Sequence, residues 1–155
     1  MSKQLSRRAQ EIIDRILYVT IATVSEAGRP WNSPVFSAHD KELNFYWGSH
    51  VDSQHSKNIR ATRRVFLVIY DSTVEAGQGE GVYVEASCHE ITEPSEIGAA
   101  HKILQDRRSV PYWKLNEVTA PAPVRLFKAV PERIWMNDDG ERDGQFIDIR
   151  KEVWN

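Results

Sequence analysis

Apolar and charged residues alternate along the chain in two patterns, one helical and one strand-like. In residues 5–17 the apolar side chains recur every three or four positions, with charged residues between them, and this spacing predicts an amphipathic helix. Residues 94–106 repeat the spacing behind Pro94, a residue that suits the first turn of a helix. The sequence therefore predicts two peripheral helices, each covering an apolar surface.

The strand-like pattern consists of short runs rich in β-branched and aromatic residues, separated by turn residues. We expect Gly48 and Ser49 to end the aromatic run, and Pro131 to separate the last two strands. Pro30 and Pro34 offer no ladder hydrogen bond, so the strand near them should lie at a sheet edge or carry a bulge. The expected strands are residues 18–24, 31–38, 43–47, 65–70, 81–93, 124–130 and 133–136.

Two of these runs predict how the sheet is buried. Residues 65–70 are continuously apolar, which is typical of a strand covered on both faces. Residues 81–93 alternate small or apolar side chains with polar ones, which is typical of a half-exposed strand. Six or seven antiparallel strands with two or three flanking helices predict a mainly β fold, an antiparallel barrel in one domain over residues 1–155.

Charge and composition exclude several classes of protein. The chain has 20 basic and 22 acidic residues, so no overall charge favours binding to nucleic acid or to a membrane surface. No apolar run is long enough to span a membrane, and the N-terminus lacks the apolar core of a signal peptide. Five tryptophans are compatible with a flat aromatic ligand or a large oligomer interface.

The distribution of cysteine and histidine argues against a disulfide framework and against a metal centre. Cys88 is the only cysteine, which fits a reducing compartment, and we expect a cytoplasmic protein. We interpret Cys88 as a small strand residue rather than a catalytic thiol. His89 and His101 are expected on exposed faces, without partners at metal-binding spacing. We predict no metal site and assign no catalytic residue.

Residues 53–60 combine hydroxyls, an amide, an imidazole and a lysine at the predicted start of a helix. A helix N-terminus offers unpaired backbone N–H groups and the positive end of the dipole. Such a segment suits an anion, although a solvated turn between two strands is the simpler interpretation. Residues 110–123, aromatic and then rich in proline, are expected to be extended, as a lid, a dimer contact or a connector.

An ordered series of motifs resembles the pyridoxamine-phosphate-oxidase-like group of flavin-binding split barrels, in particular its general-stress-protein-like members. After a leading helix come TIATVSEAGRPWNSPV, ELNFYWGS, DSQHSKNIRATRRVFLVIY, GVYVEASCHEI and VRLFKAVPERIWM. The series covers nearly the whole chain. The resemblance implies a split barrel that forms a homodimer, with two identical FMN sites at the subunit interface.

Carried over residue by residue, the resemblance implies three groups of cofactor-binding residues. One strand and its neighbour would line the isoalloxazine ring, the segment after them would surround the phosphate, and one tryptophan would come from the partner subunit. An apolar slot with a few polar contacts suits the ring, and several donors suit a phosphate. The residues are Asn32, Ser33, Pro34 and Val35; Tyr46, Trp47 and Gly48; Ser53, Gln54, His55, Lys57 and Asn58; and Trp135.

The chain departs from the family pattern at two places. His55 stands where relatives commonly have a lysine, and a neutral imidazole gives one donor and no charge. We therefore predict that affinity for the phosphate falls as pH rises through the titration of His55. The segment ERDGQFID lacks the arginine and histidine pair with which the authentic oxidases bind pyridoxamine phosphate, which argues against that substrate.

Several functions remain open on this basis. The first is a flavin-dependent oxidoreductase in which FMN carries the redox chemistry of an unidentified small-molecule substrate or reductant. The second is a non-catalytic flavin-binding module for sensing or sequestration. The barrel could also hold a deazaflavin or haem, as relatives do, or keep only the dimer with an emptied site. One scaffold carries many functions, so fold alone does not decide among these hypotheses.

Overall fold

The computed structural model describes residues 5–154. The helices are α1 (Arg7–Arg15), α2 (Gln54–Thr62), α3 (Pro94–Asp106) and the 3₁₀ turn η1 (Leu115–Glu117). The strands are β1 (Tyr18–Val24), β2 (Pro30–Phe36), β3 (Ala38–His39), β4 (Phe45–His50), β5 (Arg64–Tyr70), β6 (Gly81–Glu90), β7 (Val124–Arg142) and β8 (Gln145–Glu152).

All eight strands belong to one antiparallel sheet with the order β2-β1-β5-β6-β7-β4-β3, and β8 pairs with β7. This confirms the predicted mainly β, antiparallel barrel-like fold with flanking helices. The strand count exceeds the predicted six or seven, because β3 pairs separately with β4 and residues 145–152 return beside β7. β2 lies at one edge, as its prolines predict, and the sheet curls so that β2 also lies near β4.

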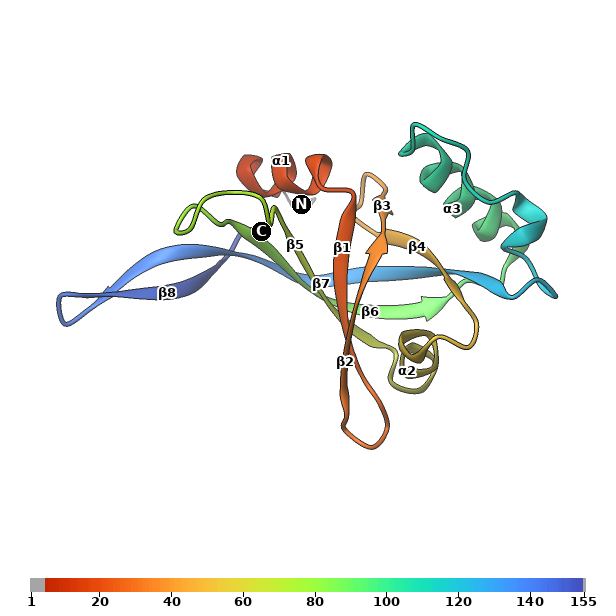
Figure 1. The fold of residues 1–155 in the computed structure, drawn as a ribbon, viewed down its shortest axis with the longest axis horizontal. Coiled ribbons are helices and arrows are strands. Elements are labelled where there is room, and N and C mark those ends of the chain that lie inside the picture. Colours follow the sequence, from red (N-terminus) through yellow and green to blue (C-terminus); the bar gives the residue numbers. More distant parts are fainter. Residues whose placement is uncertain (1–4, 155) are drawn as a thin grey trace.

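Two apolar clusters hold the fold together. The larger fills the concave side of the sheet and includes Ile12 and Ile13 of α1 and Ile59 of α2, all almost fully buried. Figure 1 shows α1 and α2 at opposite ends of the curled sheet, so that each helix closes one end. The smaller cluster lies between α3 and the outer face of β4, around Tyr46 and Tyr112.

Three local predictions were wrong. β4 continues through Gly48 and Ser49, because both residues pair in register with β7. In β5 the side chains alternate between buried and more exposed positions, so only one face of that strand is fully covered in the single chain. Residues 124–142 form one strand across Pro131, where a register shift against β6 accommodates the proline.

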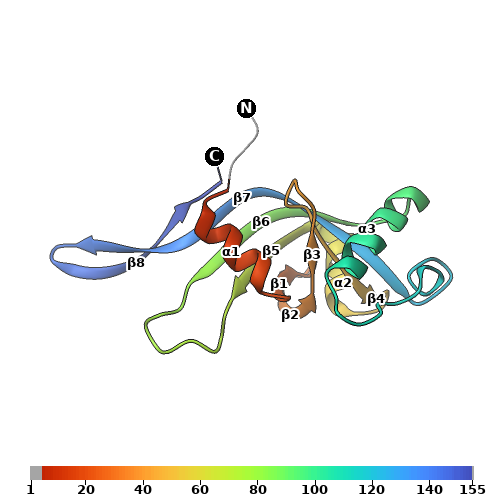
Figure 2. The same cartoon turned by 90° about the horizontal axis from the view of Figure 1, so that it is seen from above.

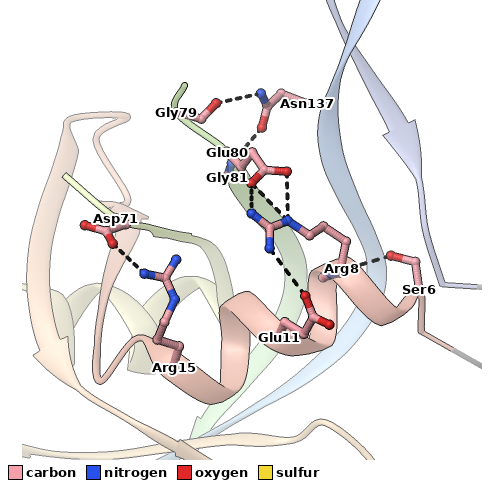
Figure 3. A network of polar contacts seen from close by, with 10 residues as sticks. Ser6, Arg8, Glu11, Arg15, Asp71, Gly79, Glu80, Gly81 and Asn137 are labelled. Atoms are coloured by element: carbon pink, nitrogen blue, oxygen red, sulfur yellow. Dashed lines mark hydrogen bonds and ion pairs between the residues drawn. The ribbon is translucent and has the colours of Figure 1, made fainter. Parts of the chain in front are cut away.

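Ion pairs fix α1 against the loop between β5 and β6 (Figure 3). Arg15 donates to Asp71 at 2.6 Å, and Arg8 bonds Glu80 while also reaching Glu11 in the next turn. The pKa of Asp71 is lowered to about 2 by hydrogen bonds from Thr73 and, to a lesser extent, from Arg15. The arginines of α1 therefore already have carboxylate partners.

The last hairpin extends beyond the barrel. β7 pairs with β6 only as far as Met136, and from Asn137 onward its sole partner among the described residues is β8. Both ribbon views show this hairpin pointing away from the rest of the molecule (Figures 1 and 2). Across residues 5–154, no helix has the length and apolar character needed to cross a membrane.

Candidate functional site

The predicted anion segment, residues 53–60, forms the N-cap and most of α2. Ser53 is the N-cap, with an extended backbone (φ −62°, ψ 148°), and its hydroxyl accepts from the backbone N–H of Ser56 at 3.4 Å. The first backbone bond of the helix runs from the N–H of Lys57 to the carbonyl oxygen of Ser53 at 3.1 Å, so the N–H groups of Gln54 and His55 precede the intrahelical ladder, as at any helix start. The helical character predicted for residues 53–60 is confirmed.

His55 connects the edge strand β2 with β4, the strand next to the opposite edge of the curled sheet. Its Nδ1 lies 3.1 Å from the hydroxyl of Ser33 on β2, and its Nε2 lies 2.7 Å from the hydroxyl of Ser49 on β4. Ser53 is also within 3.1 Å of Nε2, and the hydroxyls of Ser53 and Ser56 lie 2.7 Å apart. We call these five residues, Ser33, Ser49, Ser53, His55 and Ser56, the hydroxyl cluster.

A second layer of hydrogen bonds anchors α2 to the sheet beneath the cluster. The side-chain amide of Asn58, 2% exposed, donates to Thr23 of β1 at 3.0 Å. Gln54 donates to the carbonyl oxygen of the same amide at 2.8 Å. On β2, the indole N–H of Trp31 donates to Ser33 at 3.1 Å. These bonds hold the first turns of α2 in a fixed position against β1 and β2.

The hydroxyl cluster is polar but carries no negative charge. Among residues 5–154, no hydrogen bond or ion pair is recorded between a cluster side chain and a carboxylate. Burial lowers the pKa of His55 below its ordinary value, so its imidazole is neutral at pH 7. Lys57 is exposed in the first turn and is the nearest cation in sequence.

This donor set fits a phosphate. Hydroxyls can redirect their protons from one another to an incoming anion, and the start of α2 adds backbone N–H groups and the positive end of its dipole. An anion would also favour the imidazolium form of His55, which then donates from both ring nitrogens. The arrangement can therefore bind a phosphorylated ligand without any metal ion.

The structure separates other residues that the resemblance assigned to the same site. Trp47 is fully buried in the core and stacks on Phe127 with ring centroids 6.0 Å apart, whereas Tyr46 points to the opposite face of β4. The Tyr46 hydroxyl donates to Asp40 at 2.8 Å, and burial raises its pKa. Val35 is also buried in the core. Only Tyr46 therefore faces away from the hydroxyl cluster. Trp47 and Val35 lie on the same strand faces as Ser49 and Ser33, but their side chains are packed in the core.

Gly48 explains the position of residues 110–123. A Cβ atom on Gly48 would lie 2.4 Å from the ring of Trp113 and 2.5 Å from the hydroxyl of Tyr112. Tyr112 is 9% exposed in the cluster beneath α3. Only glycine admits this close approach, so the aromatic start of the segment packs directly against the outer face of β4.

The outer face of the sheet carries the remaining predicted residues. Asn32 and Pro34 are exposed on β2, on the face opposite Ser33. Trp135 of β7 stacks on Phe66 with centroids 6.3 Å apart, and β1, β5 and β6 lie between β7 and β2. Trp135 therefore does not meet the hydroxyl cluster of its own chain.

Sequence reasoning missed Thr23 and Ser49, and it included Ser56 only as one hydroxyl of residues 53–60. All three side chains are at least nine-tenths buried. Ser49 was interpreted as a strand end, although its even spacing from Trp47 places it on the inner face of β4. That alternation was a usable signal. Nothing local in the sequence pointed to the pairing of Thr23 with Asn58, because 35 residues separate them.

The comparisons with known proteins agree on the fold. A sequence model described as pyridoxamine 5'-phosphate oxidase matches residues 5–138. No curated protein shows significant sequence similarity to the chain. Among solved structures, the heme storage protein HutZ of Vibrio cholerae has a TM-score of 0.70 at 18% identity, with 84% of this chain and 93% of that one covered.

Two further solved structures show the same likeness. A heme binding protein of Mycobacterium smegmatis has a TM-score of 0.68 at 16% identity, covering 91% of this chain and 55% of the other. An F420 reductase has a TM-score of 0.63 at 21% identity, covering 84% and 98%. At these identities the likeness extends to the fold alone.

Proposed function

The chain belongs to the pyridoxamine 5'-phosphate oxidase family, and on this premise we propose that it binds FMN with its phosphate at the hydroxyl cluster. The observation that carries the proposal is the composition of that cluster. Hydroxyls and one neutral imidazole from β2, β4 and α2 converge at a helix N-terminus, without a carboxylate among their recorded partners in residues 5–154. Such a site favours a dianion over a cation or a neutral group.

Within this proposal, the candidate residues fall into groups according to the part of FMN that each can contact. Ser53, His55 and Gln54 hold the phosphate, Lys57 adds charge at its exposed side, and Asn58 fixes the helix against Thr23. The isoalloxazine ring lies along the exposed edge strand β2, at Asn32 and Pro34, where backbone groups are free of a second neighbouring strand. The ring does not touch the side chains of the other residues that the resemblance assigned to it. These residues pack behind the strands that line the site: Val35, Tyr46, Trp47 and Gly48.

We further propose a homodimer in which the partner's Trp135 completes each ring site. The outer face of the sheet bears exposed or half-buried aromatic side chains, among them Tyr18, Tyr70 and Trp135. Apolar surface of this kind is typical of an interface. A second copy laid against this face brings its Trp135 toward Asn32 and Pro34, which a single chain does not do.

The bound flavin would supply hydride or electron transfer, so the protein is proposed to act as an oxidoreductase on a small molecule. The role of this chain is to bind and orient the ring and to exclude water. A non-catalytic flavin module is the alternative, and consumption of NADH or NADPH distinguishes the two. Both nitrogens of the half-buried His55 contact hydroxyls, so this imidazole would have to give up one of these contacts to bind a haem iron, which favours flavin over haem.

The test begins with the absorbance spectrum of the purified protein, because flavin, deazaflavin and haem absorb differently. Titration with FMN and with riboflavin then isolates the phosphate. We expect FMN to bind about 100-fold more tightly, as two charge-assisted hydrogen bonds would give. Equal affinity for the two ligands would overturn the assignment of the hydroxyl cluster.

A matched pair of variants separates binding from helix capping. Ser53 caps α2 and Ser6 caps α1, each accepting one N–H bond of 3.4 Å. Ser53→Ala and Ser6→Ala should both lower stability by about 1 kcal/mol. Only Ser53→Ala should also weaken FMN binding, and an equal loss of FMN affinity in both variants would contradict the proposed site.

A further inference from the structure

The β7–β8 hairpin forms an arm, residues 137–150, that has no third strand beside it among the described residues. Pairing runs from Asn137 opposite Arg150 to Arg142 opposite Gln145. Figures 1 and 2 show the arm projecting from the barrel in both directions of view. A two-stranded ribbon is only marginally stable in water, so an additional surface would stabilise it.

The two faces of the arm differ. On one face, Ile147 and Ile149 close over Gly140, where an added Cβ would lie 2.9 Å from each side chain. On the other face Phe146 is 70% exposed, the highest exposure recorded for a large apolar side chain in residues 5–154. On the first face Ile149 is 40% exposed, whereas the second face leaves the larger ring of Phe146 70% exposed.

The face that carries Phe146 is also acidic. Asp139 stands directly opposite Asp148, and Glu141 stands opposite Phe146. Like charges in directly opposed strand positions are destabilising. No ion pair is recorded for these three carboxylates within residues 5–154. Arg150 is the cation on this face, and its guanidinium lies over the ring of Tyr83, 4.0 Å from the centroid. The three carboxylates outnumber it, so this face is suited to a surface that supplies positive charge.

A complementary surface lies at the far side of the same molecule. α2 and its C-cap expose Lys57, Arg60 and Arg63. Arg60 bonds Glu90 at 2.9 Å, whereas Lys57 and Arg63 have no recorded ion pair in the described part of the chain. In Figure 1 the arm and α2 lie on opposite sides of the barrel, so one chain cannot bring its own arm to its own α2.

We propose that the arm docks on the basic surface of α2 in a second copy of this chain. A two-fold axis makes the contact reciprocal, because each arm reaches the far side of its partner and two identical contacts form. The partner's cations offset the opposed carboxylates, and the body of the partner covers Phe146. This inference rests on the homodimer of the proposed function and specifies which surfaces hold it together.

Charge reversal tests the contact by sedimentation velocity at low salt. Asp139→Lys with Asp148→Lys, and separately Arg63→Glu, should each raise the dimer dissociation constant about 10-fold or more. The three changes combined should restore much of the affinity, and high salt should shrink both effects. Glu26→Lys with Glu75→Lys, which changes charge equally at two exposed turns, is the matched control and should leave dimerisation unchanged.

Phe146→Ser supplies a variant that does not act through charge. It should weaken the dimer at every salt concentration while the melting temperature of the diluted chain stays unchanged, since Phe146 is exposed in the single chain. A dimer that ignores all these changes would overturn the docked arm and leave the homodimer intact. A monomer would overturn both, and FMN titration of that monomer reports on the hydroxyl cluster separately.

Discussion

The two helices that close the barrel are built alike but held differently. α1 and α2 each have nine residues, begin behind a serine N-cap and bury isoleucines in the same core. Around α1, exposed arginines meet carboxylates of the β5–β6 loop (Figure 3). Around α2, buried hydroxyls and an amide bond one another. Ion pairs therefore hold α1 in place, whereas hydrogen bonds between uncharged groups hold α2.

This difference indicates where a ligand belongs. An anion at the α1 end would compete with carboxylates that already hold Arg8 and Arg15. At the α2 end an anion displaces only contacts between neutral groups, which are weaker than charge-assisted ones. The helix dipole favours an anion at both N-termini, so the partners of each helix decide which end can bind one.

The largest expected loss of stability comes from removing the apolar side chains that anchor α1 and α2 in the core. It tests whether the two helices are anchored equally. Ile12→Ala in α1 and Ile59→Ala in α2 each remove a side chain that is at most 2% exposed. Each should lower the free energy of unfolding by about 2–5 kcal/mol, through lost burial and an unfilled cavity. Urea denaturation measures both, and a loss below 1 kcal/mol in either variant would show that the helix is not part of the common core.

The next effect breaks the polar anchor of α2. Asn58→Ala leaves Thr23 and Gln54 without their recorded amide partner and should cost about 1–3 kcal/mol, together with weaker FMN binding. Gln10→Ala in α1 removes an exposed side-chain bond to Asp14 and should cost only a few tenths of a kcal/mol. Equal losses of stability in the two variants would show that polar contacts anchor α1 and α2 equally, contrary to the comparison above.

A smaller effect is expected from the ion pairs of α1. Arg8 and Arg15 are 54% and 55% exposed, so Arg8→Gln or Arg15→Gln should cost at most about 1 kcal/mol. The loss should shrink further at high salt because exposed charges are screened. Denaturation at two salt concentrations measures it. A loss that persists at high salt would mean that packing, not charge, holds the loop.

The smallest effect concerns pH and the α2 end alone. Burial lowers the pKa of His55 in the folded chain, so below the ordinary value of about 6.5 the unfolded chain binds more protons. The free energy of unfolding should therefore fall as pH drops below that value, and His55→Gln should reduce this slope. Melting curves of both proteins between acid and neutral pH measure the difference, and parallel curves would contradict it.

FMN should change this titration in the direction that the sequence predicts. Bound phosphate favours the imidazolium of His55, so the affinity falls as pH rises between the pKa of the free site and that of the complex. The lowered pKa of the free site means that this window begins below the ordinary histidine value. Affinity measured from acid to neutral pH checks the sign.

Much of the fold could be predicted because it depends on local pattern. β1 and α3 have the predicted bounds, since β-branched residues and a helix-starting proline act over a few neighbouring positions. The prediction that Gly48 ends its strand was wrong because this glycine makes room for the ring of Trp113, a residue distant in the sequence. Pro131 misled it because a bulge lets one strand pass a proline.

The sequence by itself determined the family, the antiparallel sheet and a helical segment at residues 53–60 with donors suited to an anion. Only the tertiary structure decided which donors meet. Ser33, 22 residues from His55, reaches its ring because the sheet curls until β2 and β4 face each other. Strand alternation then sends Ser49 inward and Tyr46 outward. Local propensities fix elements, but contacts between distant strands depend on how the whole sheet closes.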